Sequence, residues 1–470
     1  MCNKVSDNRN IAKASMWYLV SSFITKAISF LTTPFFARIL TTDEYGYYSN
    51  FATWVVLLTI IAGMSLHSTL IRARFDYKDD FEKYIFSMLI LGSLFTTIFF
   101  ALIFANSSFF SSLFVLEKRY LLLMYGYILV SPAYDMFLNE QRYKYKYKLV
   151  VALTIFTVVV NVALSFLLIA VMDDHLLARI LGSYCPLFVV ALVIYIRYFI
   201  KARGGSIVYW KYALPIAIPF VFHLLSSNIL GSSDKTMITR ICGARDNALY
   251  SMAYNLALIV NLMWSSLNNA FAPWMTEKLN TKEYGTIQKV SYPYIIIFIY
   301  LLVGMMLVAP EAILLLGGEK YYEAIYVVPP VMYGYYYMLI YSLYVNIEQY
   351  EKKTIGMAVA TAIAALTNIG LNIIFIPLFG FIAAAYTTLV GYMLLTIIHF
   401  YLVKNMKLQN IFNTKFIVVS ALLVGSLTAG ITILYSLNII RRVIIVLYVI
   451  SIIVLVIKNG SKIKHFINEK

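Results

Sequence analysis

The first half of this chain is echoed by its second half at a nearly constant distance along the sequence. Three passages recur in the same order at offsets of 202, 208 and 207 residues: Arg38-Ile39 with Tyr48-Ser49, Glu140-Gln141, and the nine residues from Asn161. Their counterparts are Arg240-Ile241 with Tyr250-Ser251, Glu348-Gln349, and the nine residues from Asn368. Two similar halves in an apolar chain are typical of a transporter, which places its substrate between the repeats near the bilayer midplane.

The residues around these passages are too apolar for a water-soluble domain. The chain is 61% hydrophobic and 13% charged, and its mean hydropathy is +0.79. A soluble domain carries about 25% charged residues, which keep its surface wet. The sequence therefore predicts an all-α integral membrane protein.

Apolar runs of about 20 residues, the length that crosses a bilayer, recur along the whole chain. Each repeat is expected to hold six spans, and a final pair has no counterpart, which makes about fourteen in all. An even number of spans per repeat makes the two halves parallel. The expected lobes are residues 1–205 and 206–405, followed by two further helices and a cytoplasmic tail in 406–470. The predicted spans are 16–36, 48–70, 85–105, 120–138, 149–171, 177–199, 212–237, 248–272, 290–309, 326–347, 355–376, 381–403, 416–437 and 443–457.

The distribution of Lys and Arg predicts the orientation, because cytoplasmic loops carry the excess of these residues. With the N-terminus inside, 27 of the 38 Lys and Arg fall on the inner side and 10 on the outer side, and Lys26 lies within a span. Both termini are therefore predicted to be cytoplasmic. The formal net charge of +16 then reflects attraction to anionic lipid headgroups, so nucleic acid is not expected as a partner.

Nothing in the sequence predicts covalent chemistry. The five histidines are widely separated, and metal-ligand spacing, a Gly-rich phosphate loop and a nucleophile elbow are all absent from the sequence. We therefore expect no enzyme, no cofactor and no metal site.

Ionisable side chains at membrane depth are the candidates for function, because each costs at least about 2.5 to 3.5 kcal/mol there. Lys26 lies near the middle of the first span, and Arg38 closes that span. Arg240 closes the seventh span, one to two turns after Asp234 and Lys235. Asn228 occupies the place of Lys26 in the second repeat, so equivalent depths of the two halves are expected to face one cavity. The predicted substrate-binding residues are Lys26, Arg38, Asn228, Lys235 and Arg240.

Three further side chains are candidates for ion coupling. Asp234 lies in a polar stripe of the seventh span, His223 follows Pro219 by about one turn, and Asp135 follows Pro132 in the fourth span. Histidine changes its charge near neutral pH, and a carboxylate can bind a cation or a proton. The structural alternatives are ion pairs with neighbouring helices for Asp234 and Lys235, snorkelling of Arg38 and Arg240 to the interface, and ordinary helix packing for His223 and Asp135.

Three passages of the chain resemble the polysaccharide and oligosaccharide flippases of the O-antigen (Wzx) type. These belong to the multidrug/oligosaccharidyl-lipid/polysaccharide (MOP) exporter superfamily. The first passage is 13–18 with 34–40 and 44–48, the second is 233–243 with 250–254 and 269–274, and the third is 365–380.

The resemblance implies a MATE-like core of twelve helices in two lobes, with two C-terminal helices added. It also implies transfer of an undecaprenyl-pyrophosphate-linked oligosaccharide, an O-antigen or capsule repeat unit, across a bacterial cytoplasmic membrane. The resemblance further implies alternating access, ion coupling, and partners in the glycan polymerase and chain-length machinery.

Three alternatives remain at this point. A cation-coupled multidrug antiporter would need acidic groups in its cavity, whereas the candidates here are mainly basic. A membrane glycan polymerase is disfavoured by the repeat and by short outer loops. A membrane scaffold without transport activity would not need buried cations, so neutral replacement of Lys26 or Lys235 would leave glycan export unchanged.

Overall fold

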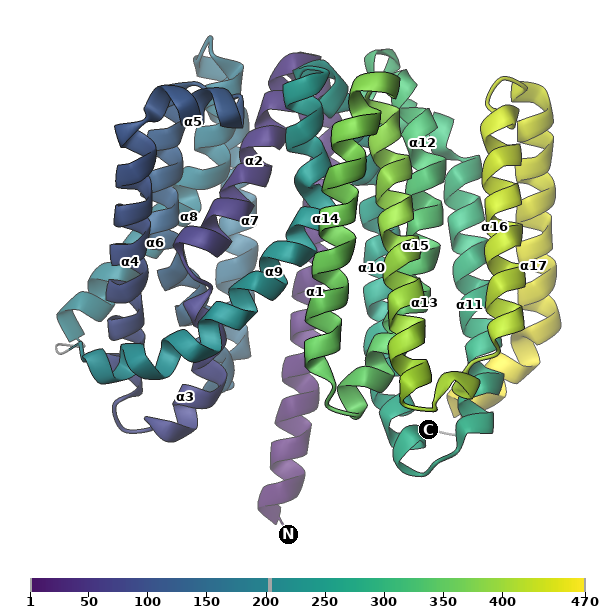
Figure 1. Cartoon of the computed structure of the whole chain (residues 1–470), viewed down its shortest axis with the longest axis horizontal. Helices are drawn as coiled ribbons and strands as arrows, with labels where there is room; N and C mark the ends of the chain where they lie inside the picture. Colours follow the sequence, from purple (N-terminus) through teal and green to yellow (C-terminus); the bar gives the residue numbers. More distant parts are fainter. Residues whose placement is uncertain (1, 202–204, 469–470) are drawn as a thin grey trace. The chain divides into compact units, whose positions relative to one another are not determined.

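The computed structural model describes residues 2–201 and 205–468, and within these ranges every regular element is a helix (Figure 1). The α-helices of the first half are α1 (Cys2–Ile39), α2 (Thr42–Ala62), α3 (Leu70–Asp76), α4 (Phe81–Ala105), α5 (Ser107–Phe114), α6 (Lys118–Tyr143), α7 (Tyr147–Val171) and α8 (His175–Lys201). Those of the second half are α9 (Ile207–Ile241), α10 (Ala244–Asn280), α11 (Tyr284–Leu307), α12 (Ala309–Gly317), α13 (Val328–Tyr350), α14 (Thr354–Phe379), α15 (Phe381–Asn405), α16 (Thr414–Leu434) and α17 (Asn438–Asn468). Three short 3-10 helices are η1 (Leu66–Thr69), η2 (Glu319–Val327) and η3 (Gln409–Ile411).

The predicted spans fall on helices, all but 48–70 on one long helix each, which confirms an all-α membrane protein. Ten of the described helices are long and apolar enough to cross a bilayer, and a bent pair makes an eleventh span. The remaining predicted spans lie on α10, α13 and α17. Arg203 and Lys470, two of the predicted inner cations, lie outside the described residues.

The order of helices repeats along the chain. In the first half, from α1 to α8, the short helix α5 follows the long helix α4. In the second half, from α9 to α15, the short helix α12 follows the long helix α11 in the same way. Helix α5 begins at Ser107 and α12 at Ala309, an offset of 202 residues. The repeat found in the sequence is therefore also a repeat of secondary structure, including two short helices that the apolar pattern did not predict.

The second predicted span, 48–70, differs from the structure because the helix breaks inside it. Helix α2 ends at Ala62, and the chain resumes as η1 and α3 at an angle of 52°. Met64 and Ser65, between the two parts, have φ values of +52° and +44°. Left-handed backbone of this kind cannot continue a right-handed helix, and the apolar character of the run concealed the break.

The helices form two compact units. Unit 1 comprises Met1–Ser251 with Thr361–Ala384, and unit 2 comprises Met252–Ala360 with Ala385–Lys470. The predicted lobes 1–205 and 206–405 and the terminal segment 406–470 follow the repeat, and they stay a prediction.

Unit 1 is held together by apolar packing of α4, α6, α7 and α8. Tyr84, Met88 and Ala133 are buried in one cluster, and Phe100 and Met124 in a second. Large apolar side chains also cover the outside of the helices, as at Val171 with an exposed fraction of 77%. Such an exterior suits lipid rather than water, because buried and exposed residues are both apolar.

An arginine links α17, the last helix, to the rest of unit 2. Arg441, at the start of α17, is 1% exposed and forms hydrogen bonds of 2.6 and 2.7 Å with both carboxylate oxygens of Glu311 on α12. It also donates to the carbonyl oxygen of Leu307 at 2.8 Å. A bidentate pair of this kind fixes both distance and orientation, so it holds α17 against α11 and α12.

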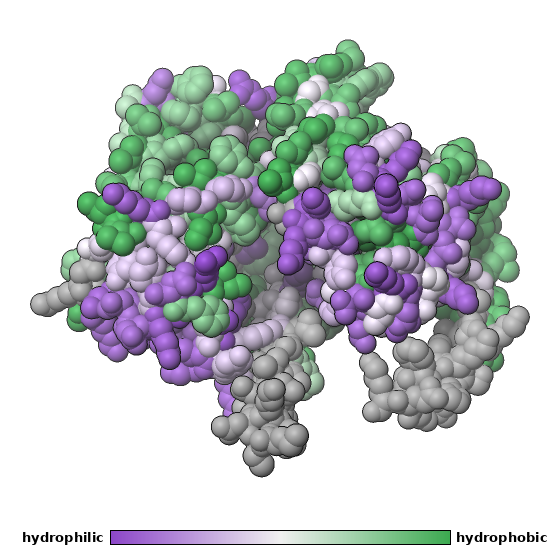
Figure 2. Space-filling model, turned by 60° about the horizontal axis from the view of Figure 1, so that its bottom comes forward, coloured by the Kyte–Doolittle hydropathy of each residue, from purple (hydrophilic) through white to green (hydrophobic). Residues whose placement is uncertain are grey.

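Hydrophilic side chains gather on the face that Figure 2 turns forward. The segments 72–83 of unit 1 and 278–289 of unit 2 are both rich in exposed charged residues. The sides of the helices are hydrophobic in the same view. This separation is what a bilayer favours, because a charged group inside its apolar core costs several kcal/mol unless it is paired.

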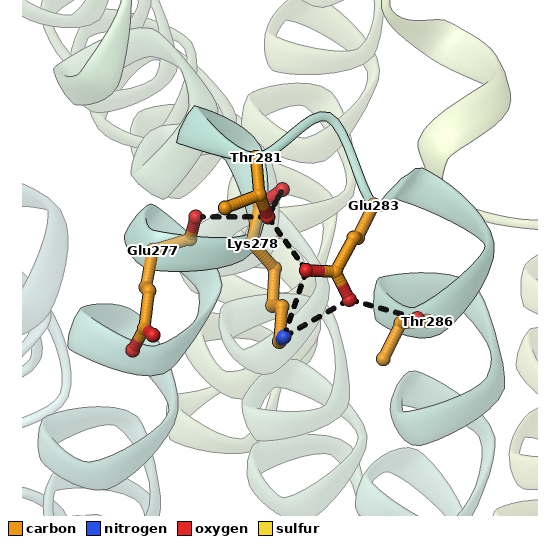
Figure 3. Close-up of polar contacts among 5 residues, drawn as sticks. All are labelled: Glu277, Lys278, Thr281, Glu283 and Thr286. Carbon is orange, nitrogen blue, oxygen red and sulfur yellow. Dashed lines mark hydrogen bonds and ion pairs between the residues drawn. The ribbon is translucent and has the colours of Figure 1, made fainter.

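The turn between α10 and α11 is organised by Glu283 (Figure 3). Its carboxylate accepts hydrogen bonds from Lys278 at 2.9 Å to each oxygen and from Thr281 at 2.8 Å. Lys282 within this turn has a φ of +58°. The hydrogen bonds from Lys278 and Thr281 hold the pKa of the Glu283 carboxyl below its usual value.

Helices α7 and α8 cross so closely that only glycine fits. A Cβ on Gly182 would lie 2.3 Å from the Cα of Ser165. We expect Gly182→Ala to lower the free energy of unfolding by about 1 to 3 kcal/mol, because the helices must move apart. Thermal unfolding in detergent measures this effect. Gly370→Ala on α14 is the control, since nothing lies within 4 Å of its added Cβ, and equal stability of both variants would contradict the close crossing.

Acid should loosen the turn around Glu283. Because the folded state lowers the pKa of Glu283, its contribution is complete above the ordinary carboxyl pKa and is lost as the pH falls through the lowered value. Hydrogen-exchange protection of the amides of 279–288 should therefore fall in acid, and in Glu283→Gln it should be low already at neutral pH. Glu277→Gln is the control, because Glu277 enters this network only through its backbone carbonyl. Unchanged protection in Glu283→Gln would show that the turn does not depend on this carboxylate.

Candidate functional site

The two arginines that close the repeated helices occupy matching places. Arg38 lies in the last turn of α1 and Arg240 in the last turn of α9, and both side chains are exposed. Cations at a helix C-terminus interact favourably with the helix dipole, typically by 0.3 to 1 kcal/mol. Both arginines therefore have a stabilising role available to them besides contact with a ligand.

Lys26 and Asn228 occupy equivalent positions on α1 and α9, before the two arginines, and both are half-buried. Within 2–201 and 205–468, the Lys26 ammonium has no hydrogen-bond or ion-pair partner. The Asn228 amide donates to the carbonyl oxygen of Leu224 on its own helix at 2.9 Å, which leaves its side-chain oxygen to accept. A cation and an amide thus occupy equivalent positions of the two repeats.

Asp234 is the centre of a buried polar cluster in unit 1. Its side chain is fully buried, and its two carboxylate oxygens accept hydrogen bonds from Tyr250 on α10 at 2.5 Å and Asn372 on α14 at 2.6 Å. Asn372 also donates to the side-chain oxygen of Asn368 at 3.3 Å. Lys235, the next residue on α9, is half-buried. Three helices thus converge on one carboxylate, an arrangement that can hold a proton or a small cation.

The first repeat contains a related cluster that is built around a cation instead of an anion. Arg179 on α8 donates to the hydroxyl of Ser165 on α7 at 2.8 Å. Its guanidinium carbon lies 3.5 Å from the ring centre of Phe36 and 4.7 Å from that of Tyr48. Tyr48 and Ser165 are the repeat counterparts of Tyr250 and Asn372, so two related clusters are built around opposite charges. Sequence reasoning did not single out Arg179, which lies near the predicted outer end of its span.

Asp135 borders a cavity. The cavity has a volume of about 410 Å³ within unit 1, and Tyr127, Ser131, Tyr134 and Tyr184 line it together with apolar residues of α2. The hydroxyl of Ser131 is buried without a hydrogen-bond partner. A carboxylate, three tyrosines and the Ser131 hydroxyl thus border a cavity whose wall is otherwise mainly apolar.

His223 lies apart from both carboxylates in its described contacts. It is half-buried on α9, and its ring centre is 6.5 Å from that of Phe220. The structure thus places the three ion-coupling candidates in three different environments, and among them Asp234 forms side-chain hydrogen bonds to other helices. Within 2–201 and 205–468, no group of three or more His, Cys, Asp or Glu could hold a metal ion.

A contact between the two repeats lies at the beginning of α2 and α10, within unit 1. Ser49 and Ser251, which are repeat counterparts, share a hydrogen bond of 2.6 Å. Asn247 donates to the carbonyl oxygen of Gly46 at 2.9 Å, and a Cβ on Gly46 would lie 1.8 Å from the carbonyl oxygen of Ala244. The helices meet backbone to backbone at this point.

Two buried glutamates escaped the search of the sequence for functional residues. Glu140 and Glu348 are both fully buried near the C-terminal ends of α6 and α13. The signal was present, because the Glu-Gln pair recurs at an offset of 208 residues. It was used only to align the repeats, since both residues lie just beyond the predicted ends of their spans.

Comparison with known proteins identifies a family and a fold. The model of a family described as "Polysaccharide biosynthesis protein" matches residues 11–279. Protein 1 of the Lsg locus of Haemophilus influenzae is 24% identical over an alignment that covers 71% of this chain and 84% of the relative. An uncharacterized membrane protein of Methanocaldococcus jannaschii is also 24% identical, over 96% and 94% of the two chains.

Two solved structures have the same fold. The lipid II flippase MurJ in an inward closed conformation superposes with a TM-score of 0.74 at 15% identity, covering 94% of this chain and 99% of that one. An inward-facing multidrug resistance MATE transporter of the MOP superfamily gives a TM-score of 0.56 at 14% identity, covering 82% and 98%.

Proposed function

Because the chain belongs to the polysaccharide biosynthesis protein family, we propose that it is a flippase for lipid-linked oligosaccharides. It moves an undecaprenyl-pyrophosphate-linked O-antigen or capsule repeat unit from the cytoplasmic to the outer leaflet by alternating access. The observation that carries this proposal is the matching of Lys26 with Asn228 and of Arg38 with Arg240 on α1 and α9, with Lys235 added on α9.

The substrate explains why cations stand on these helices. A pyrophosphate in hydrocarbon needs compensating positive charge, and charge-assisted hydrogen bonds supply it. Lys26 and Lys235 offer point charges, whereas Arg38 and Arg240 offer planar forks for two phosphate oxygens. Asn228 can bond a sugar hydroxyl through its free side-chain oxygen.

The proposed location is the bacterial cytoplasmic (inner) membrane with both termini in the cytoplasm. The excess of Lys and Arg on one side supports this orientation. The proposed partners are the glycan polymerase and chain-length machinery, which would take the repeat unit at the outer face.

A gradient of ions is the proposed source of energy, and Asp135, His223 and Asp234 are its candidate binding groups. The contacts of Asp234 and the cavity at Asp135 support these two over His223. A multidrug antiporter remains the second candidate, and the acidic cavity at Asp135 is the observation that favours it.

Alternating access requires the contact between α2 and α10 to separate once in each cycle. We expect the pair Ser49→Cys and Ser251→Cys to form a disulfide under oxidation, because the replaced hydroxyl oxygens are only 2.6 Å apart. Export of surface glycan should stop on oxidation and resume on reduction. Each single variant is a control, and continued export by the cross-linked protein would contradict a gate at this contact.

Removing a cation of the path should slow export. In cells that lack the protein, we expect the lipid-linked repeat unit to accumulate on the cytoplasmic face, and a plasmid copy to relieve this. Lys26→Ala and Lys235→Ala should each slow transfer by about 10- to 100-fold, the effect of losing one charge-assisted hydrogen bond. Lys353→Ala, at an exposed loop position, is the matched control.

The side on which the lipid accumulates separates the alternatives. Accumulation on the outer face would indicate a polymerase, and no accumulation would indicate a drug or ion exporter. Full export by both lysine variants would favour a scaffold and would remove the two lysines from the proposed path.

A further inference from the structure

Glu348 and His399 form a buried acid–base pair in unit 2. The ring nitrogen Nδ1 of His399 on α15 lies 2.7 Å from Oε1 of Glu348 on α13, and the two side chains are 1% and 0% exposed. The second carboxylate oxygen of Glu348 is buried without any hydrogen-bond partner. A buried carboxylate oxygen without a donor is rare, because it forfeits the hydrogen bonds that water would have given it.

In the first repeat, the corresponding buried glutamate has a different set of partners. Glu140, the counterpart of Glu348, accepts hydrogen bonds from Lys144, from Tyr198 and from Gln141, the last at 3.2 Å. A permanent ammonium therefore neutralises Glu140. In the second repeat the residues that follow Glu348 at the same spacing, Gln349 and Lys352, are exposed instead.

Within 2–201 and 205–468, no Lys or Arg forms a hydrogen bond or an ion pair with Glu348 or His399. Tyr341 stacks on the His399 ring with centres 5.7 Å apart, and a phenol carries no charge at neutral pH. Lys289, Lys352, Lys353 and Lys415 of unit 2 are exposed, and the Lys404 ammonium lies 5.7 Å from the centre of the Tyr401 ring.

One proton makes this pair neutral as a whole. With one proton bound, the pair is either a carboxylate beside an imidazolium or a carboxylic acid beside an imidazole. The net charge is zero in both forms. Without this proton, a net negative charge would remain in an apolar site, which is strongly unfavourable. Imidazole is also the side chain whose unperturbed titration lies nearest neutral pH.

We propose that Glu348 and His399 form a proton-binding site that couples the transport cycle to the proton gradient. The inference rests on the proposed flippase function and names the coupling ion. In each cycle one proton binds the pair from the outside and leaves it toward the cytoplasm, while one lipid-linked oligosaccharide moves outward. Glu140, permanently paired with Lys144, takes no part in this exchange.

The test uses the full-length protein in proteoliposomes with a fluorescent undecaprenyl-pyrophosphate-linked disaccharide as the probe. Two quantities are measured: exchange of the probe between leaflets without a gradient, and its accumulation in one leaflet under a gradient of one pH unit. Coupling to one proton raises the accumulation ratio by up to about tenfold. We expect Glu348→Gln and His399→Gln to keep exchange and to lose the pH-driven accumulation.

Two control variants separate coupling from folding. Glu140→Gln should keep pH-driven accumulation, and Glu348→Asp, which retains a carboxylate, should keep at least part of it. Wild-type accumulation in both Glu348→Gln and His399→Gln would overturn the proposal. If Glu348→Gln does not fold, His399→Gln decides alone, and a wild-type ratio there overturns the proposal.

The same experiment distinguishes failure of the site from failure of the function. If the wild-type protein does not move the probe at all, the flippase proposal fails. If it moves the probe but responds only to a sodium gradient, or to no gradient, the flippase stands and the proton site is refuted.

Discussion

Hydrocarbon offers no partner to a charge, and this constraint governs the placement of polar groups throughout the structure. Asp234 is surrounded by Tyr250 and Asn372, Arg179 by Ser165 and two aromatic rings, and Glu140 by Lys144 and Tyr198. Each cluster ties together helices that are distant in sequence. Polar side chains therefore serve here as specific links between helices, while apolar packing supplies the bulk of the contact.

The two repeats keep one framework and differ in the charges they place on it. A tyrosine recurs as Tyr48 and Tyr250 in both clusters, yet the charge beside it is a guanidinium in one and a carboxylate in the other. A glutamate recurs as Glu140 and Glu348, yet its partner is a lysine in one and a histidine in the other. A fixed charge stabilises one arrangement, whereas an exchangeable one can respond to its surroundings. The two repeats therefore share the arrangement of their helices and differ in the charges of their side chains.

The sequence was sufficient for the fold class and the long helices, and it singled out one residue of the buried clusters, Asp234. Span length follows from bilayer thickness, so the long helices could be predicted, and Asp234 stood out as an ionisable residue in an apolar helix. Its partners could not be predicted, because Tyr250 and Asn372 lie 16 and 138 residues away. The break after α2 lies at Gly63, but the apolar character of the run concealed it, and the left-handed backbone is adopted by Met64 and Ser65 rather than by the glycine. Glu348 was overlooked because it lies at the edge of a predicted span.

The contact of Ser49 with Ser251 has a further meaning for a protein made of two parallel repeats. Where a residue meets its own counterpart, the pair must be complementary to itself, as at the centre of a two-fold symmetric dimer interface. Two carboxylates or two ammonium groups would repel one another there, and two large side chains would collide. A hydroxyl can both donate and accept, so one serine satisfies another at 2.6 Å without any change of residue type. Few side chains meet this condition, and the place where the halves touch is therefore more restricted in chemistry than any surface that faces lipid.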